Sequence, residues 1–237
     1  MMMAIKKTKK KSVQDDAVQD DVRETEIRNK FLLKKDEKSG RSGTDAYLIV
    51  KKIKYHFELK STTTGSVTTA RDFGMEHIKK LGPKHWLIGK YNRAKDLLKV
   101  YYLSPKMMKP WIEKIEKYIK PDFELLDLII EEITFKSLNA LLGDFKYYSF
   151  EEVEKLQKKQ IIKHKDLKEK YQSYIDKIKG MIPKEKMLIV LQDRCRYLMH
   201  RGATLNNPKI SKNYLEDNGR VVENQKDLIE ILTKHSL

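Results

Sequence analysis

The sequence TDAYLIVKKIKYHFELK, residues 44–60, places an aspartate before one short apolar run and a glutamate and a lysine at the end of the next. Both runs have the composition and alternation of β-strands, in which successive side chains emerge on opposite faces of a sheet. Glu58 and Lys60 therefore belong to one face, and Phe57 and Leu59 belong to the other. The stretch predicts a sheet with one reactive face and one core face.

The elements expected around this stretch follow from the hydrophobic periodicity and from its breaks. Only Lys51 and Lys52 separate the two runs, a length that favours a β-hairpin although the preferred Asn-Gly is absent. The alternation of helices with strands indicates an α/β protein. Its sheet is expected to mix parallel and antiparallel strands, as in α+β folds. The predicted elements are helix 20–33, strands 45–50 and 53–60, helix 70–81, strands 85–91 and 98–103, and helix 106–120, which we expect Pro121 to end.

Beyond Pro121 the pattern becomes almost wholly helical, and no second sheet is expected. We predict a disordered basic arm at 1–16, because its lysines repel one another, a core at 17–120, and a helical, loop-rich extension at 121–237. The helices predicted in the extension are 123–142, 150–179, 185–199 and 227–233, with a polar loop at 204–214.

The charge of the chain indicates its class of partner. Fifty lysines and arginines against 34 acidic residues give a formal net charge of +16, which attracts polyanions by releasing their counterions, so nucleic acid is the leading partner. Composition also leaves open an anionic membrane surface as the partner, or a charge that serves only solubility.

Cys195 is the single cysteine, and no run approaches the ~20 apolar residues of a membrane span. We therefore expect a cytoplasmic protein that is neither secreted nor membrane-spanning.

The triplet Glu58-Leu59-Lys60 is weak by itself, because a chain of this composition produces an acid and a base at that spacing about seven times by chance. Its setting is more informative. The triplet ends an alternating strand, an aspartate opens the paired strand, an acidic helix precedes both, and a helix and a strand follow. In this arrangement the region 20–103 resembles the PD-(D/E)xK nuclease superfamily, and the chain is most similar to a type II restriction endonuclease.

The resemblance implies a restriction-endonuclease-like core of the αβββαβ type with a mostly helical C-terminal extension. It also implies that Asp45 and Glu58 hold Mg²⁺, with the main-chain carbonyl of Leu59 as a further ligand, and that Lys60 positions the attacking water. Mg²⁺ prefers hard oxygen ligands of this kind. The plainer alternatives are a solvated surface pair for the glutamate and lysine, and a turn-ending role for the aspartate.

In this family a glutamate on the preceding helix often assists catalysis, and Glu24 is the residue in that position. Glu24 lies on the apolar stripe of its helix, where an unpaired carboxylate would be costly, although Arg28 at i+4 is a possible partner. Glu26, on another face, is the second choice. Thr44 stands where the family has a proline.

Two polar segments are predicted to contact DNA. The hydroxyl-rich run after Lys60 and the arginine beyond it can donate hydrogen bonds to phosphate oxygens, and the amides and lysines of the 204–214 loop can reach base edges. An exposed loop and a capping turn are the alternatives. The predicted DNA-binding residues are Thr62, Thr63, Thr64, Ser66, Arg71, Asn206, Asn207, Lys209, Lys212 and Asn213.

The resemblance therefore implies a type II site-specific deoxyribonuclease that uses Mg²⁺ to hydrolyse double-stranded DNA. It further implies a homodimer, a cognate DNA methyltransferase as functional companion, and an extension that serves DNA recognition or dimerisation. Another PD-(D/E)xK nuclease, such as a resolvase, repair or transposon endonuclease, and a non-catalytic nucleic-acid-binding protein are the alternatives.

Overall fold

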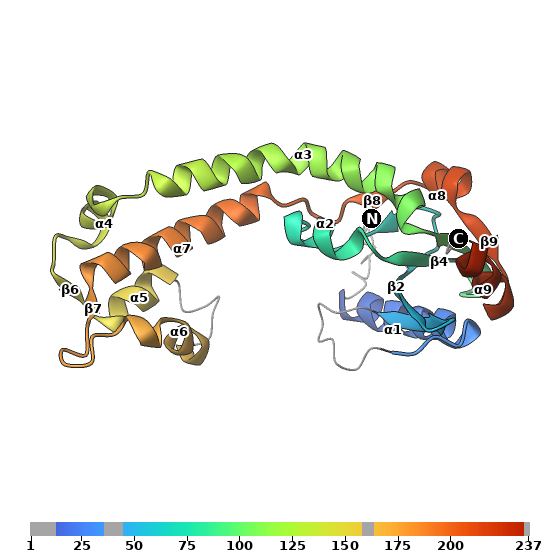
Figure 1. Ribbon diagram of the computed structural model, residues 1–237, viewed down its shortest axis with the longest axis horizontal. Coiled ribbons are helices and arrows are strands. Elements are labelled where there is room, and N and C mark those ends of the chain that lie inside the picture. Colours follow the sequence, from blue (N-terminus) through green and yellow to red (C-terminus); the bar gives the residue numbers. More distant parts are fainter. Residues whose placement is uncertain (1–12, 36–44, 158–163, 235–237) are drawn as a thin grey trace, which may run out of the picture. The chain divides into compact units, whose positions relative to one another are not determined.

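The computed structural model describes residues 13–35, 45–157 and 164–234. The chain divides into two compact units, one formed by 1–115 with 206–237 and the other by 116–205 (Figure 1). Residues 1–12 of the predicted disordered arm, as well as Thr44, lie outside the described residues, whereas 13–16 are helical and the prediction of disorder is wrong for them. The elements of the first unit are α1 (Val13–Lys30), β1 (Ala46–Val50), β2 (Ile53–Thr62), β3 (Val67–Thr68), α2 (Met75–Leu81), β4 (His85–Tyr91), β5 (Leu97–Leu103), the start of α3 (Pro105–Glu131), β8 (Lys209–Ile210), α8 (Lys212–Asn218), β9 (Arg220–Val222) and α9 (Gln225–Lys234).

The first unit is built on a five-stranded sheet in the order β1-β2-β4-β5-β9. β2 and β4 are parallel, and the other neighbours are antiparallel, so the predicted mixed α/β sheet is confirmed. The predicted hairpin is present between β1 and β2. Lys51 and Lys52 adopt φ of 48° and 69°, the positive angles that a two-residue hairpin turn of this kind requires. β9, at one edge of the sheet, was not predicted.

Helices cover both faces of this sheet. α1 and α9 pack on one face, where Ile27, Phe57 and Leu228 belong to one buried cluster. On the other face Trp86 of β4 meets Trp111 of α3, with ring centroids 6.3 Å apart. Glu58 is paired with Trp86 in the parallel register and so shares that covered face. At Trp86, the face that we expected to be reactive is therefore covered by α3.

The end of β2 extends beyond its hairpin partner. β1 pairs with residues 53–57, whereas β4 pairs with residues 57–62. From Glu58 to Thr62, β2 therefore has no β1 neighbour. α1 contacts both β2 and β4, so a side chain from this helix can reach the motif past the uncovered edge of β2.

α2 is shorter than the helix 70–81 that the pattern predicted. It starts at Met75, because the residues before it pair with the C-terminal part of the chain. The Thr69 N–H donates to the Pro208 carbonyl at 3.2 Å, and the Asn207 N–H donates to the Ala70 carbonyl at 3.1 Å. These main-chain hydrogen bonds replace those that another helical turn would make.

The prediction that Pro121 ends a helix is wrong, since α3 continues through it to Glu131. Proline removes one hydrogen bond to the carbonyl four residues earlier, here that of Lys117. Both Pro121 and Lys117 are exposed, so water can satisfy this carbonyl. Burial of Ile119 and Leu126 on another face of α3 compensates for the lost bond.

The second unit is mainly helical, as predicted, but its segmentation differs. The predicted helix 123–142 is interrupted between α3 and α4, and 150–179 is not one helix. A two-stranded sheet, β6 with β7, contradicts the expectation that no second sheet exists. No helix among the described residues is long and apolar enough to cross a membrane. The elements are the remainder of α3, α4 (Phe135–Leu142), β6 (Tyr147–Tyr148), α5 (Phe150–Gln157), α6 (His164–Tyr171), the 3₁₀ helix η1 (Gln172–Tyr174), β7 (Ile182–Pro183) and α7 (Lys184–Ala203).

The boundary between the units also differs from the expected one at residue 120. The first unit ends at Ile115, within α3, and the chain returns to it at Asn206. Residues 206–237 are therefore part of the sheet unit and not of a C-terminal extension. The physical reason is β9, which completes the sheet by pairing with β5.

Candidate active site

Three carboxylates from separate parts of the first unit meet at the ammonium group of Lys60. Its Nζ lies 3.2 Å from Glu58 Oε1, 3.3 Å from Glu24 Oε1 and 3.9 Å from Asp45 Oδ2. Glu24 comes from α1, Asp45 directly precedes β1, and the other two lie on β2. The four side chains are between 11% and 28% exposed. The structure thus brings together all four residues for which the sequence predicted catalytic roles.

Asp45 is fixed by the main chain of the motif. The Leu59 N–H donates to Asp45 Oδ2 at 2.9 Å, and Lys60 Nζ donates to the Leu59 carbonyl at 2.8 Å. The carboxylate of Asp45 and the carbonyl of Leu59 therefore lie next to the same cation. Because this bond joins Asp45, just before β1, to the main chain of β2, Asp45 does more than end the preceding turn.

Lys84 completes the cluster and was not predicted from the sequence. Its Nζ donates to Glu58 Oε2 at 2.8 Å, and its side chain is only 4% exposed. Lys84 precedes β4, and the parallel pairing of β4 with β2 sets the start of β4 beside Glu58. Glu58 is therefore held by Lys60 at Oε1 and by Lys84 at Oε2. This arrangement excludes the solvated surface pair considered for Glu58 and Lys60.

Burial and charge shift the pKa values of the three carboxyl groups in different directions. Burial raises the pKa of Glu24 to about 7, although Lys60 acts in the opposite direction. Burial, followed by the charge of Glu58, raises the pKa of Asp45. Burial also acts to raise the pKa of Glu58, but Lys60 and Lys84 together bring it below its usual value. Glu58 is thus the firmly ionised member of the cluster.

Lys60 remains a cation in this environment. Burial acts to lower the pKa of Lys60, but the charges of Glu58, Glu24 and Asp45 outweigh it and raise that pKa. An ammonium group surrounded by carboxylates is well placed to donate hydrogen bonds and poorly placed to act as a base.

A cavity of about 490 Å³ adjoins Asp45, Glu58 and Lys60. α2 contributes His77 and Lys80 to its wall, two residues that were not predicted from the sequence. His77 Nδ1 accepts a hydrogen bond from the Gly74 N–H at 3.3 Å, which assigns the proton of the neutral ring to Nε2. Burial, followed by the charge of Lys80, lowers the pKa of His77. The rest of the wall consists of Thr69, Ala70, Glu76 and Leu81.

The structure distinguishes Glu24 from Glu26. Glu26 Oε2 accepts a hydrogen bond from the hydroxyl of Tyr91 at 3.0 Å, whereas Glu24 contacts Lys60. Arg28, the partner considered for Glu24, donates to the Thr25 hydroxyl at 2.7 Å. Glu24 is therefore the acid of α1 that belongs to the cluster.

The oxygen atoms around Lys60 have the chemistry that Mg²⁺ requires. Asp45, Glu58 and the Leu59 carbonyl supply hard oxygen ligands, and they already surround a positive charge. The described residues contain no set of three or more His, Cys, Asp or Glu arranged as a complete metal cage. Mg²⁺ needs no such cage, because it commonly binds through one or two carboxylates and keeps several waters. The residues present therefore fit this ion.

The two segments predicted to contact DNA lie side by side, although more than 130 positions separate them in the sequence. β3 pairs with β8, setting Val67 opposite Ile210 and Thr68 opposite Lys209. The Thr69 hydroxyl donates to the Pro208 carbonyl at 2.8 Å. Since Thr69 also lines the cavity, the paired segments adjoin the acidic cluster.

Most of the predicted DNA-binding side chains are available at the surface. Thr62 is different, because it is 5% exposed and its hydroxyl donates to the Ser66 carbonyl at 2.7 Å and accepts from the Gly65 N–H at 3.0 Å. Thr62 therefore shapes the turn and cannot serve phosphate without opening it. Ser66 and Asn207 are half-buried, and the exposed residues are Thr63, Thr64, Arg71, Asn206, Lys209, Lys212 and Asn213.

Comparison with models of protein families gives no match for this sequence, and comparison with curated proteins gives none either. The geometry of the site is therefore the basis on which a function can be proposed.

Proposed function

We propose that this chain is a Mg²⁺-dependent endonuclease of the PD-(D/E)xK type, and specifically a type II restriction endonuclease that hydrolyses phosphodiester bonds in double-stranded DNA. The observation that carries the proposal is the convergence of Glu24, Asp45 and Glu58 on Lys60 beside a cavity. Buried charges are costly unless they are paired, and residues with strongly shifted pKa values cluster at functional sites. Three acids and two lysines in one cluster are more than a stable core requires.

Each residue of the cluster has a part in such a reaction. Asp45, Glu58 and the Leu59 carbonyl would hold Mg²⁺, which when bound neutralises charge on the phosphate and lowers the pKa of a water. Lys60 donates a hydrogen bond that orients the attacking water, and Glu24 holds the Lys60 side chain in place. Phosphoryl transfer depends mainly on such positioning and electrostatic stabilisation.

The surroundings of the cluster suit a polyanionic substrate. Lys80 and His77 Nε2 offer donors to phosphate oxygens at the cavity wall. The adjoining segments offer Arg71, Lys209 and Lys212 for the DNA backbone. The net charge of +16 favours the encounter with DNA from a distance.

For a restriction enzyme we expect a cognate DNA methyltransferase that protects the host.

The decisive experiment is to incubate the purified chain with unmethylated phage DNA, with and without Mg²⁺, and to sequence the ends of the fragments. We expect discrete fragments that form only with the metal and share one sequence at their ends. Cleavage restricted to branched or damaged DNA would favour a resolvase or repair nuclease. Salt-sensitive binding without any nicking would favour a non-catalytic binding protein.

Single-residue variants test whether the cluster is responsible. Glu58→Ala and Lys60→Ala should abolish cleavage while the fold and DNA binding persist. Glu24→Gln should reduce cleavage, and Glu26→Gln is its matched control on the same helix, because Glu26 bonds to Tyr91 away from the cluster. Full activity in purified Glu58→Ala and Lys60→Ala would refute the proposed site.

A further inference from the structure

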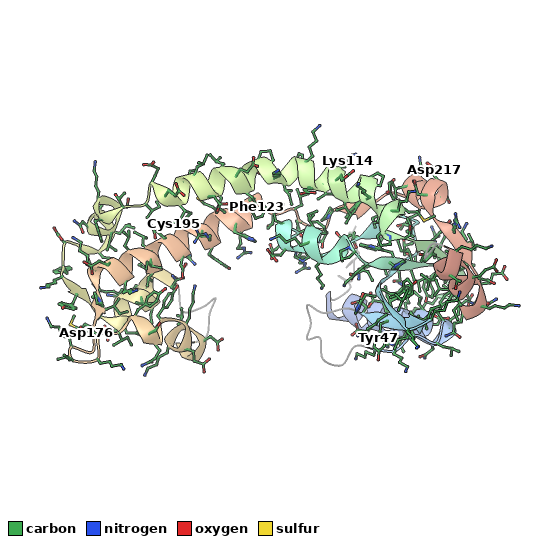
Figure 2. The ribbon with its side chains drawn as sticks, in the orientation of Figure 1. Tyr47, Lys114, Phe123, Asp176, Cys195 and Asp217 are labelled. Atoms are coloured by element: carbon green, nitrogen blue, oxygen red, sulfur yellow. The ribbon has the colours of Figure 1, made fainter. Side chains whose placement is uncertain are left out.

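The buried face of α7 carries an arginine that the cluster around Lys60 does not use. Met187, Val190 and Leu191 are at most 2% exposed and belong to the apolar core of the second unit. Arg194 continues this face at the next position of the helical repeat and is only 6% exposed. The residue after it, Cys195, is labelled on α7 in Figure 2. Packing alone would favour an apolar side chain at this position, because a buried charge is costly without a partner.

The part of the chain that the structure describes gives Arg194 no carboxylate partner. The adjacent acid, Asp193, is already engaged, since its Oδ2 lies 2.7 Å from Lys170 Nζ and accepts from the Tyr171 hydroxyl at 2.9 Å. The described acids of α3, α5 and α6 form no ion pair with the arginine either. Residues 158–163, which are not described, contain no acid. The guanidinium group is therefore covered without a counter-ion.

Tyr197, one turn further along α7, sets Arg194 beside a second arginine. The Arg194 Cζ lies 5.4 Å from the centroid of the Tyr197 ring, and Nη1 of Arg201 donates to the Tyr197 hydroxyl at 3.5 Å. Spacings of three and four residues place the three side chains on one face of the helix. From residue 194 to the end of α7 at Ala203 the sequence contains no acid. Two guanidinium groups held at one ring repel each other, and a shared anion would replace this repulsion by attraction.

The guanidinium of Arg194 can be reached from solvent although most of the side chain is covered. None of its nitrogen atoms is both buried and unbonded, unlike Nε of Arg23 in the first unit. Since these nitrogens form no hydrogen bond within the described residues, they contact solvent. Arg201 is exposed, and Tyr197 is half-buried. An incoming anion would meet the charged end of Arg194 in surroundings of low dielectric constant, where attraction between charges is stronger than in bulk water.

We propose that Arg194, Tyr197 and Arg201 form a phosphate-binding site on α7. A guanidinium group binds phosphate oxygens through two parallel hydrogen bonds, and a tetrahedral phosphate accepts such donors from more than one direction. A carboxylate has both oxygens in one plane and suits a single guanidinium better than two. The Tyr197 hydroxyl can donate a further hydrogen bond. The phosphate belongs either to a nucleic-acid backbone, which the net charge of +16 attracts, or to a small phosphorylated molecule.

Urea unfolding separates a binding role of Arg194 from a structural one. Arg194→Met keeps a long apolar side chain and removes the charge. We expect the urea midpoint not to fall, because the variant no longer buries a charge without a counter-ion. Inorganic phosphate should raise the midpoint of the wild type more than that of Arg194→Met; comparing the two proteins cancels the stabilisation that excluded salts give to any protein. Arg196→Met is the matched control and should respond as the wild type does, since Arg196 is exposed on the opposite side of α7.

Binding of a labelled DNA duplex, measured by fluorescence anisotropy in EDTA, distinguishes the two sources of phosphate. For a backbone phosphate, Arg194→Met and Arg201→Met should each weaken binding about tenfold. Each should also make the dependence of log K on log salt less steep by about one. If both variants lose the response to inorganic phosphate but bind the duplex as the wild type does, the ligand is a small phosphorylated molecule. Both measurements are made without Mg²⁺, so the proposal does not rest on the nuclease function and can fail or hold independently of it.

Two results would overturn the site. One is an equal response of the wild type, Arg194→Met and Arg201→Met to both phosphate and duplex. The other is a lower urea midpoint of Arg194→Met with unchanged responses to both, which would give this arginine a structural role. Arg201 is exposed, so Arg201→Met decides between binding and no binding if Arg194→Met does not fold.

Discussion

Replacing Lys84 by Met removes the charge that holds Oε2 of Glu58 while it leaves a side chain of similar size. In the wild type the two charged atoms lie 2.8 Å apart, and the side chains are 4% and 11% exposed. In the variant Glu58 stays buried with Lys60, at 3.2 Å, as its remaining cation in the cluster. Removing one partner of a buried ion pair costs about 3–5 kcal/mol, and because Lys60 remains we expect about 3 kcal/mol.

This loss of stability should depend on pH in a direction set by Glu58. In the wild type the pKa of Glu58 lies below its ordinary value of 4.5. Glu58 therefore stabilises the fold above pH 4.5, and this stabilisation is lost as the pH falls through the folded-state pKa. In Lys84→Met only Lys60 remains of the two lysines that lower the pKa of Glu58 against the effect of burial, so we expect that pKa to rise. The carboxyl then takes up a proton as the pH falls, and the cost of burying its charge disappears. The difference between the two proteins should be largest near pH 8 and smaller near pH 5.

Urea unfolding at both pH values measures this difference in the free energy of unfolding. Lys79→Met is the control, because Lys79 is 71% exposed and makes only a surface pair with Glu76 at 3.2 Å. Such exposed pairs contribute less than about 1 kcal/mol. The reasoning fails if Lys84→Met costs no more than Lys79→Met at pH 8, or if its cost is the same at both pH values.

Three other substitutions test separate parts of the structure. Glu24→Gln removes a carboxyl whose folded-state pKa is about 7 against an ordinary 4.5. As the pH rises from 4.5 to 7, the wild type should therefore lose about 3 kcal/mol of unfolding free energy relative to the variant. Urea unfolding in which both proteins depend on pH in the same way would contradict this expectation. Gly65→Ala should destabilise the protein by about 1–2 kcal/mol, because φ is +95° and a Cβ would lie 3.0 Å from Cγ of Lys212. Gly202→Ala in α7 is the control that should not destabilise in this way, since its Cβ meets nothing within 4 Å, and equal effects of the two substitutions in urea unfolding would refute the argument. Gly89→Ala sets a Cβ 2.9 Å from Cδ1 of Ile27 on α1, so we expect about 1–3 kcal/mol of destabilisation and, under the proposed function, weaker DNA cleavage from a displaced Glu24. Unchanged stability and activity would show that α1 adjusts freely.

Local patterns in the sequence determined the strands and their faces. Alternation located β1, β2, β4 and β5 to within a residue or two, and it correctly separated Phe57 and Leu59 from Glu58 and Lys60. Alternation works because the side-chain period of a strand is local geometry. Helix ends were less predictable, since partners elsewhere in the chain determined where α2 begins and allowed α3 to pass through Pro121.

Tertiary structure alone decided how the site is completed. The parallel register of β4 beside β2 brings Lys84 to Glu58, and the packing of α1 at the uncovered edge of β2 selects Glu24 over Glu26. The pairing of β3 with β8 joins two polar segments from distant parts of the chain. Such contacts depend on the order of the strands and on which segments return to the sheet, and the hydrophobic periodicity of the sequence predicts neither. The sequence by itself determined which residues form the motif and on which strands they lie, and the tertiary structure determined which neighbours hold their charges in place.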